Sequence, residues 1–254
     1  GNSYPSPNGQ GETGDVPHDT DDKYLDLNER INFDYHFTPN HNLNFNTLFH
    51  YAKRQPKDDI ASQHAGFTIG GYPSNMTSFI SGLTWEANFF NKRLINMLSA
   101  KVFHLNSKIE DLTSYEMMEP PKQKQNKATE FGWIEAIKYE VIPHVHLKAS
   151  YQRAIRLPNP QELFGDGISI FPAASLRPEK SHNFNAGFLI DKNNFLGMKR
   201  VQFETSAYYM QVTDMIKLMQ QYRSAGYVNA EKVEIKGIEG ELKVDVTPTV
   251  YVYG

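Results

Sequence analysis

Residues 25–37 read LDLNERINFDYHF, and residues 43–51 read LNFNTLFHY. In the first segment the odd positions are mostly apolar and the even positions are polar. The second segment repeats this alternation after a short reversal at Pro39 to Asn42. Because successive side chains of a strand point to opposite faces, each segment predicts a strand with one apolar wall and one polar wall. Together the two segments predict an antiparallel hairpin.

Short and long connections alternate along the rest of the chain. Tight reversals are predicted at Pro39 to Asn42, Phe90 to Arg93, Ile142 to His144, Asp191 to Lys199 and Thr247 to Thr249. Open stretches are expected at 54–78, 106–128, 155–180 and 213–226. A soluble sandwich has no reason to place all its short connections at one end. A bacterial outer-membrane barrel does, because its periplasmic turns are short and its extracellular loops are long.

The same rhythm predicts about ten strands joined as an up-and-down meander. They are expected near 24–38, 42–54, 78–90, 94–106, 129–142, 145–155, 180–192, 199–213, 227–246 and from 249 onward. A tilted strand climbs ~2.5 Å per residue, so an apolar band ~25 Å tall should end about ten residues from each short turn. Charged residues stand near that height at Glu29, Lys53, Arg153 and Lys236. The predicted fold class is therefore all-β, an antiparallel transmembrane β-barrel segment.

The alternation also assigns side chains to two faces. Toward lipid we expect Leu27, Phe33, Phe45, Phe49, Leu83, Trp85, Tyr139, Leu147, Phe203 and Leu242. Toward the lumen we expect Asn28, Arg30, Asn44, Glu86, Lys138, Lys148 and Glu204. Glu135 breaks the pattern, since it shares the apolar face with Trp133 and Ile137, and a bulge or a register change is the expected explanation.

Composition narrows the class of protein. Hydrophobic residues make up 39% and the mean hydropathy is -0.56, and no apolar run approaches the ~20 residues of a membrane-spanning helix. Aromatic residues at 13% suit the girdles of a barrel, although a large soluble β-protein with an aromatic core is the alternative on composition alone. The net charge of -3 argues against a nucleic-acid surface, and the basic run Lys122 to Lys127 is predicted to be a solvated loop. Cysteine is absent, which excludes disulfides and thiolate metal sites.

Two ordered motifs resemble a known family. Residues 150–165 read SYQRAIRLPNPQELFG and are followed by LRPEKSHNF at 176–184. Later, GYVNA at 226–230 precedes IKGIEGEL at 235–242. Both closely resemble the barrel of TonB-dependent outer-membrane receptors, although Ile155 replaces the usual aromatic residue and Leu157 the usual Ala. The residues that match the family motifs are Arg156, Pro158, Glu162, Leu163, Pro178, Glu179, Asn183, Asn229, Gly237 and Glu239.

This resemblance implies a 22-stranded barrel filled by an N-terminal plug that engages TonB. Residues 1–254 are then expected to be one partial barrel domain, a fragment without the plug. The implied function is active import of a scarce nutrient across the bacterial outer membrane, with a siderophore, vitamin, peptide or glycan as cargo. The implied partners are the nutrient ligand, the TonB complex through the plug, and membrane lipid; no nucleic acid is expected.

The loops supply the candidate binding residues. Aromatic side chains that are candidates for cargo capture, each also a candidate loop anchor, are Tyr72, Tyr115, Phe164, Phe171, Tyr222 and Tyr227. Pro158 and Pro160 cannot donate ladder hydrogen bonds and should end a strand. Arg156, Glu162 and Glu179, with Lys180, are expected to pair across the base of a loop and to brace it rather than to hold cargo.

No enzymatic or metal chemistry is predicted. Haem receptors of the resembled family typically carry a His between the two boxes, and residues 157–175 contain none. His144 and His146 stand beside a turn, which is weak evidence for a metal site. Glu130, Glu135 and Glu140 recur every five residues, so they alternate faces and cannot form one acid/base pair. We expect no cofactor and no catalytic residue.

Two other functions remain open at this stage. A passive porin-like or adhesive outer-membrane barrel has the same alternation, and only the two family motifs argue against it. A secreted soluble β-protein that binds glycans is the other alternative.

Overall fold

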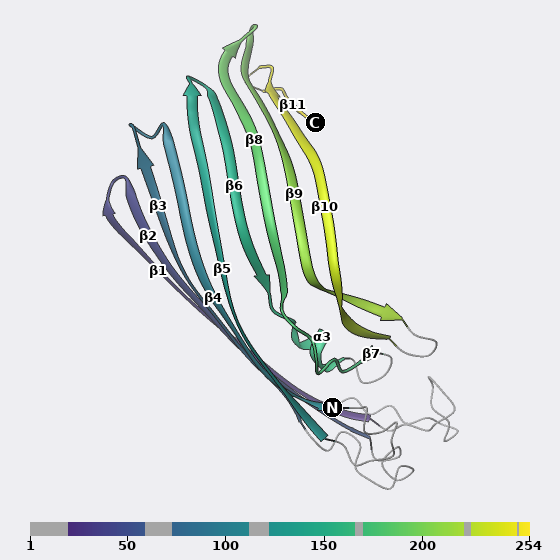
Figure 1. Cartoon of the computed structure of the whole chain (residues 1–254). Coiled ribbons are helices and arrows are strands. Elements are labelled where there is room, and N and C mark those ends of the chain that lie inside the picture. The colour runs from purple at the N-terminus through teal and green to yellow at the C-terminus, as the bar shows by residue number, and fades with distance from the viewer. Residues whose placement is uncertain (1–19, 59–72, 112–121, 166–169, 221–224, 248) are drawn as a thin grey trace.

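A computed structural model describes residues 20–58, 73–111, 122–165, 170–220, 225–247 and 249–254. The chain forms one curved sheet in which neighbouring strands are long and steeply inclined (Figure 1). Its strands are β1 (Thr20–Thr38), β2 (His41–Asp58), β3 (Ser74–Phe89), β4 (Leu94–Asp111), β5 (Lys122–Ile142), β6 (Val145–Arg156), β7 (Ile170–Phe171), β8 (Glu179–Phe195), β9 (Met198–Gln220), β10 (Ala225–Asp245) and β11 (Tyr251–Tyr253). A five-residue helix, α3, spans Pro160–Phe164.

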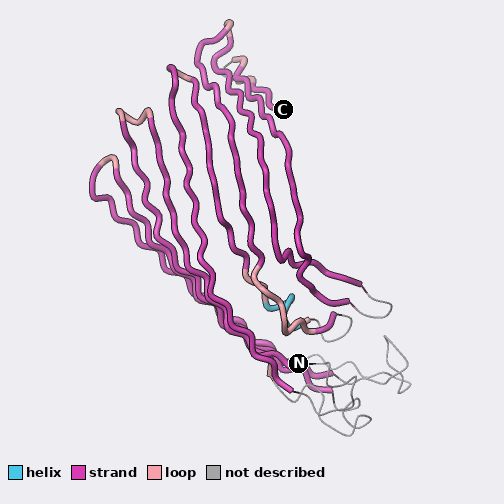
Figure 2. The backbone as a smooth tube through the Cα atoms, viewed as in Figure 1, coloured by secondary structure: helices cyan, strands magenta, loops and turns pink. Residues whose placement is uncertain are grey.

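The predicted meander is confirmed. Strands pair in the order β1-β2-β3-β4-β5-β6-β8-β9-β10-β11, and each pair on this path is antiparallel. The short turns lie together at one end of the sheet, at the top of the view in Figure 2. Only β7 lies off the path, as a two-residue strand parallel to Ala225 and Gly226 of β10. In the described residues, no helix has the length and hydrophobicity needed to cross a bilayer.

Several predicted boundaries were wrong because the strands continue past the apolar band. The basic run Lys122 to Lys127, predicted to be a solvated loop, forms the start of β5 and pairs with β4. β9 likewise runs on to Gln220, and the turn predicted over Asp191 to Lys199 narrows to Leu196 and Gly197. Backbone hydrogen bonds do not require apolar side chains, so a ladder can extend into water after the alternation of hydrophobicity has ended.

The strand register separates the two predicted sets of side chains onto opposite faces. Asn28 lies opposite His50, and Lys138 opposite Lys148, whereas Phe45 lies opposite Leu83 and Phe203 opposite Leu242. The loop after β6 packs on the polar face, which we call the inner face. The other, outer face leaves large apolar side chains exposed, among them Leu27 at 50%, Phe33 at 60% and Leu147 at 52%. Such a wall suits contact with lipid.

Glu135 was expected to mark a bulge or a register change, and that expectation was wrong. Pairing is continuous through Glu135, which lies opposite Leu98 on one side and Tyr151 on the other. Its carboxylate therefore lies on the outer face, where the Asn96 side-chain amide donates a hydrogen bond to it. A local polar pair, rather than a change in strand geometry, accommodates the charge.

Candidate functional site

The loop after β6 begins with a compact helical turn. Asn159 precedes α3, and its side-chain oxygen accepts a hydrogen bond from the Glu162 N–H at 2.8 Å. Glu162 Oε2 in turn accepts from the Asn159 N–H at 2.9 Å, which completes a capping box. Pro160 occupies the first helical turn, where its missing N–H costs nothing. The sequence NPQE thus fixes where the helix starts.

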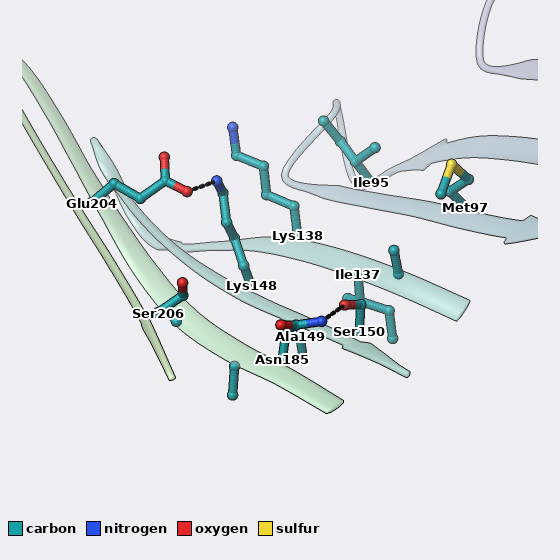
Figure 3. Close-up of a pocket in the computed structure, with 13 residues that line it drawn as sticks. Ile95, Met97, Ile137, Lys138, Lys148, Ala149, Ser150, Asn185, Glu204 and Ser206 are labelled. Atoms are coloured by element: carbon teal, nitrogen blue, oxygen red, sulfur yellow. Dashed lines mark hydrogen bonds and ion pairs between the residues drawn. The ribbon is translucent and has the colours of Figure 1, made fainter. Parts of the chain in front are cut away.

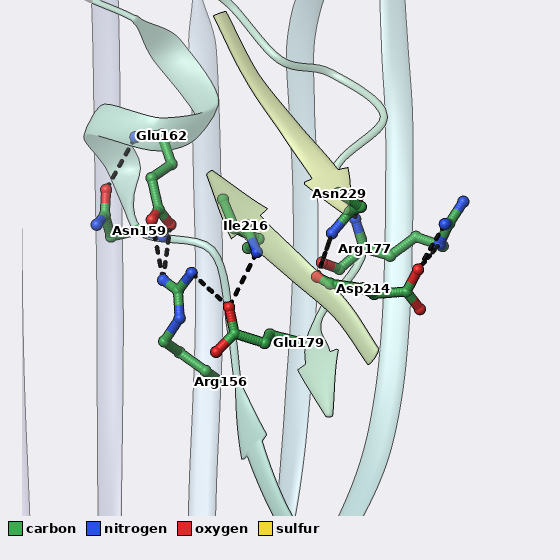
Figure 4. Close-up of polar contacts among 8 residues, drawn as sticks. All are labelled: Arg156, Asn159, Glu162, Arg177, Glu179, Asp214, Ile216 and Asn229. Atoms are coloured by element: carbon green, nitrogen blue, oxygen red, sulfur yellow. Dashed lines mark hydrogen bonds and ion pairs between the residues drawn. The ribbon is translucent and has the colours of Figure 1, made fainter. Parts of the chain in front are cut away.

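Arg156 joins this helix to the start of β8 (Figure 4). Its Nη1 donates to both carboxylate oxygens of Glu162, at 2.9 and 3.1 Å, and its Nη2 donates to Glu179 at 3.0 Å. Burial alone would lower the pKa of Arg156, but hydrogen bonds to Glu179 and Glu162 raise it above its usual value. The predicted pairing of these three residues is therefore observed. Lys180 does not join them, because its ammonium lies 2.6 Å from Glu130.

A second polar cluster fixes the far end of the loop to β9 and β10. The Asn229 amide donates to the backbone oxygens of Arg177 at 3.0 Å and Asp214 at 2.7 Å, and its oxygen accepts from the Arg177 N–H at 2.9 Å. The Arg177 guanidinium also binds the Asp214 carboxylate at 2.6 Å. Asp214 has a φ of 55°, and the pairing of β9 with β10 is interrupted there. One amide side chain thus satisfies backbone groups of two segments.

Between these clusters the loop packs on the inner face of the sheet. We call residues 157–165 and 170–178 the inner loop. Leu163, Phe164 and Leu176 are 0%, 3% and 2% exposed, and they lie in one apolar cluster with side chains from β2, β3, β4 and β9. The sheet members of this cluster are Ala52, Met76, Leu105, Ile109 and Ile216. The inner loop therefore crosses the inner face from β6 toward β2.

Arg54 of β2 fastens the tip of the inner loop. Its Nη1 donates to the backbone oxygens of Phe164 at 3.2 Å and Gly165 at 2.5 Å, at the C-terminal end of α3. Its Nε donates to the Asp22 carboxylate at 2.7 Å. Arg54 is 6% exposed, so a charged hydrogen bond of this kind is strong. Sequence patterns did not single out Arg54 or Asp214, since each meets its partner only through the fold.

The family-motif glycine Gly237 has a steric reason. A Cβ at this position would lie 2.5 Å from the Tyr208 hydroxyl oxygen and 2.7 Å from its Cζ, because the Tyr208 ring covers the glycine from the opposite strand. Asn183, another motif residue, donates to Gln152 at 3.4 Å across β6 and β8. Both residues therefore contribute to contacts between neighbouring strands of the sheet.

The predicted cargo-capture aromatics separate into three groups. Tyr72, Tyr115 and Tyr222 lie outside the described residues. Phe164 is buried in the inner-loop core, and Tyr227 is half-buried against it, so both anchor the loop. Phe171 on β7 is 52% exposed and is the described member of the set most accessible to a ligand.

A hollow of about 370 Å³ lies nearer the short turns, between β4, β5, β6, β8 and β9. Lys138 and Lys148 project there side by side, and the Lys148 ammonium contacts the Glu204 carboxylate (Figure 3). Ser150 accepts a hydrogen bond from Asn185 at 3.3 Å in the same wall. The inner face thus combines charges with small polar groups.

Among the described residues, no group of three or more His, Asp or Glu side chains is arranged to hold a metal ion. The polar clusters join backbone and side chains of neighbouring segments, and this arrangement suits bracing rather than acid/base chemistry.

Comparison with known proteins identifies the family. Residues 131–254 match the model of the TonB-dependent receptor-like β-barrel. These residues therefore belong to the TonB-dependent receptor β-barrel family. Strands β1 to β4, outside the matched residues, continue the same antiparallel ladder. No curated protein sequence matches the chain.

Solved structures share the fold of this TonB-dependent receptor barrel. The hemophore receptor HasR of Serratia marcescens superposes with a TM-score of 0.59 and 14% identity over 90% of this chain and 40% of HasR. The FrpB iron transporter of Neisseria meningitidis superposes with a TM-score of 0.62 and 14% identity, over 91% of this chain and 34% of FrpB. The ferric yersiniabactin uptake receptor FyuA of Yersinia pestis superposes with a TM-score of 0.59 and 15% identity, over 97% of this chain and 35% of FyuA. The chain therefore spans between 34% and 40% of the length of these three proteins.

Replacing Glu162 with Ala in the full-length receptor is expected to lower its free energy of unfolding by about 1 to 3 kcal/mol, since Arg156 and the α3 cap lose a charged partner. Cargo affinity of the folded receptor should be unchanged. Denaturant unfolding in detergent and a binding titration measure the two effects. Glu241→Ala is the matched control, because Glu241 is exposed and its carboxylate accepts a hydrogen bond from Lys243 two residues along the same strand. Normal stability with lost binding would instead make the inner loop a cargo site.

Proposed function

We propose that this barrel is part of a receptor that imports a scarce nutrient across the bacterial outer membrane, with energy supplied through TonB. The family match over residues 131–254 is the observation that carries the proposal. The braced inner loop supports it, because a firmly held loop on the inner face narrows the path that a cargo would take. Engagement of TonB would use the plug domain that the family resemblance implies. Siderophore, vitamin, peptide and glycan cargo are the classes considered.

Phe171, together with Tyr72, Tyr115 and Tyr222, is a proposed cargo contact. The exposed ring of Phe171 stands at the long-loop end of β10, where incoming cargo would arrive first. Aromatic side chains offer large contact areas at low entropic cost. HasR is described in complex with a hemophore and haem, FrpB as an iron transporter and FyuA as a ferric yersiniabactin uptake receptor, so iron sources are the first cargo to test.

Growth of a gene deletion strain on single iron sources tests the proposal. We expect the deletion to abolish growth on at least one limiting source, and the full-length gene to restore it only in cells that contain TonB. Restoration without TonB would favour a passive or adhesive barrel. Recovery of the protein from buffer rather than from detergent-extracted membranes would favour a soluble glycan-binding protein.

A further inference from the structure

The outer face changes character sharply at the long-loop end of β2 to β5. The last large apolar side chains that point outward are Tyr51, Phe79, Val102 and Phe131 on these four strands. Phe79, Val102 and Phe131 are 42%, 43% and 50% exposed, as expected for a wall that meets lipid. Beyond them, the outward positions are polar or charged.

Four lysines stand in this polar zone, and one of them, Lys57 near the end of β2, has an interaction of its own. The other three are Lys53, Lys108 and Lys127. Every second residue of a strand points outward. Toward the long loops, Lys53 is the first outward residue after Tyr51, Lys127 is the second after Phe131, and Lys108 is the third after Val102. Lys53 and Lys108 both lie opposite Asn75, so two strand spacings of ~4.8 Å separate their backbones. Lys108 lies opposite Gln125, which places Lys127 diagonally adjacent, at about 7 to 8 Å between Cα atoms. Flexible lysine side chains at these spacings can converge on one anionic group.

The groups between the three lysines are neutral hydrogen-bonding partners. The Gln125 amide donates to Asn106 at 2.9 Å. Glu110, the outward carboxylate farther along β4, is 4% exposed and has other interactions. Among the described residues, no ion pair joins Lys53, Lys108 or Lys127 to a carboxylate.

Two lysines on the strands toward the other edge of the sheet, β8 and β10, differ because they are paired with carboxylates. Lys180 contacts Glu130 at 2.6 Å, and Lys232 contacts Glu234 at 2.8 Å. Lys180 and Lys232 near the long-loop end of β8 and β10 are thus each paired with a carboxylate of the chain, whereas Lys53, Lys108 and Lys127 have no such partner among the described residues. We call Lys53, Lys108 and Lys127 the lysine belt.

We infer that the lysine belt binds the phosphate groups of lipid headgroups in the membrane leaflet that faces the long loops. A cluster of positive charges on the long-loop side of an apolar surface matches a lipid, whose acyl chains would contact the apolar surface and whose phosphate would contact the lysines. Lysine ammonium groups bind phosphate as point charges and need no fixed geometry. This inference rests on the membrane placement given by the proposed function, but it does not depend on the cargo or on TonB.

The test uses the full-length receptor in dodecyl maltoside, with diphosphorylated lipid A as the probe and native mass spectrometry as the readout. A triple Lys53→Gln, Lys108→Gln and Lys127→Gln variant should bind the probe about a hundredfold more weakly, since each lysine near an anionic headgroup contributes roughly fivefold. Dephosphorylated lipid A should bind the parent and the variant equally. Added salt should weaken binding of the phosphorylated probe to the parent.

A triple Lys92→Gln, Lys199→Gln and Lys243→Gln variant removes the same charge from exposed positions at the short-turn end of the sheet. It should bind the phosphorylated probe like the parent. Equal losses in both triple variants, or no loss in the lysine-belt variant, would overturn the inference. If the lysine-belt variant fails to fold, Lys127→Gln alone and the salt dependence of the parent decide, because Lys127 is exposed. Nutrient uptake is scored separately, so an importer without this lipid site and a lipid-binding barrel without import are distinguishable.

Discussion

Replacing Arg54 with Met in the full-length receptor is expected to lower its free energy of unfolding by about 3 kcal/mol. The guanidinium is 6% exposed, and its loss removes the hydrogen bonds to the Phe164 and Gly165 carbonyls. The Asp22 carboxylate also loses a partner at 2.6 Å. Denaturant unfolding in detergent measures the change. Hydrogen exchange at residues 160–165 should increase, because the inner loop is released from β2.

Arg30→Met is the matched control for this change. Arg30 lies on the same inner face, but its side chain is exposed on β1. A change within about 0.5 kcal/mol is expected for such a position. Similar losses in the two variants would mean that Arg54 contributes through general charge rather than through its contacts with the inner loop.

Substituting Ala for Gly165 is expected to destabilise the receptor by about 3 kcal/mol or more. Gly165 has a φ of 66°, and a Cβ there would lie 2.0 Å from the Ile170 carbonyl oxygen. The obstacle is backbone, so a side-chain rotation cannot relieve it. The fraction of receptor that resists heating in detergent on a gel, and its unfolding midpoint, are the measurements.

Gly226→Ala provides the comparison, because a Cβ at Gly226 meets no atom within 4 Å. That variant should unfold within about 1 kcal/mol of the parent, as expected for a glycine replaced at an unstrained strand position. If Gly165→Ala were equally stable, the close approach of β7 to the end of α3 would not exist in the folded protein.

The sheet could be predicted from the sequence because its signal is local. Alternation at Leu25 to Phe37 and short turns such as Pro39 to Asn42 depend only on neighbours along the chain. Strand ends were predicted less well. Lys122 to Lys127 reads as a loop, yet β4 supplies a complete hydrogen-bonding partner for it.

The inner loop could be predicted only in part. Arg156, Glu162 and Glu179 lie within 24 residues of one another, and their complementary charges predicted the pairing. Arg54 lies more than 100 residues from Gly165, so no pattern along the chain relates them. Phe164 was predicted as a candidate cargo contact because it is aromatic, and only the packing of β2 to β4 beneath it shows that it is buried.

The two attachments of the inner loop bear on the shape of the barrel mouth. One lies at Arg54 on β2, and the other lies where β7 pairs with Ala225 and Gly226 of β10. Six strands, β3 to β6, β8 and β9, separate these points along the sheet. The inner loop therefore spans the curved sheet from β2 to β10, and its length limits how far apart these two strands can lie. The inner loop also contacts β3, β4, β5 and β9 between these two points, so we expect that shortening or lengthening it would change the curvature of the whole sheet between β2 and β10.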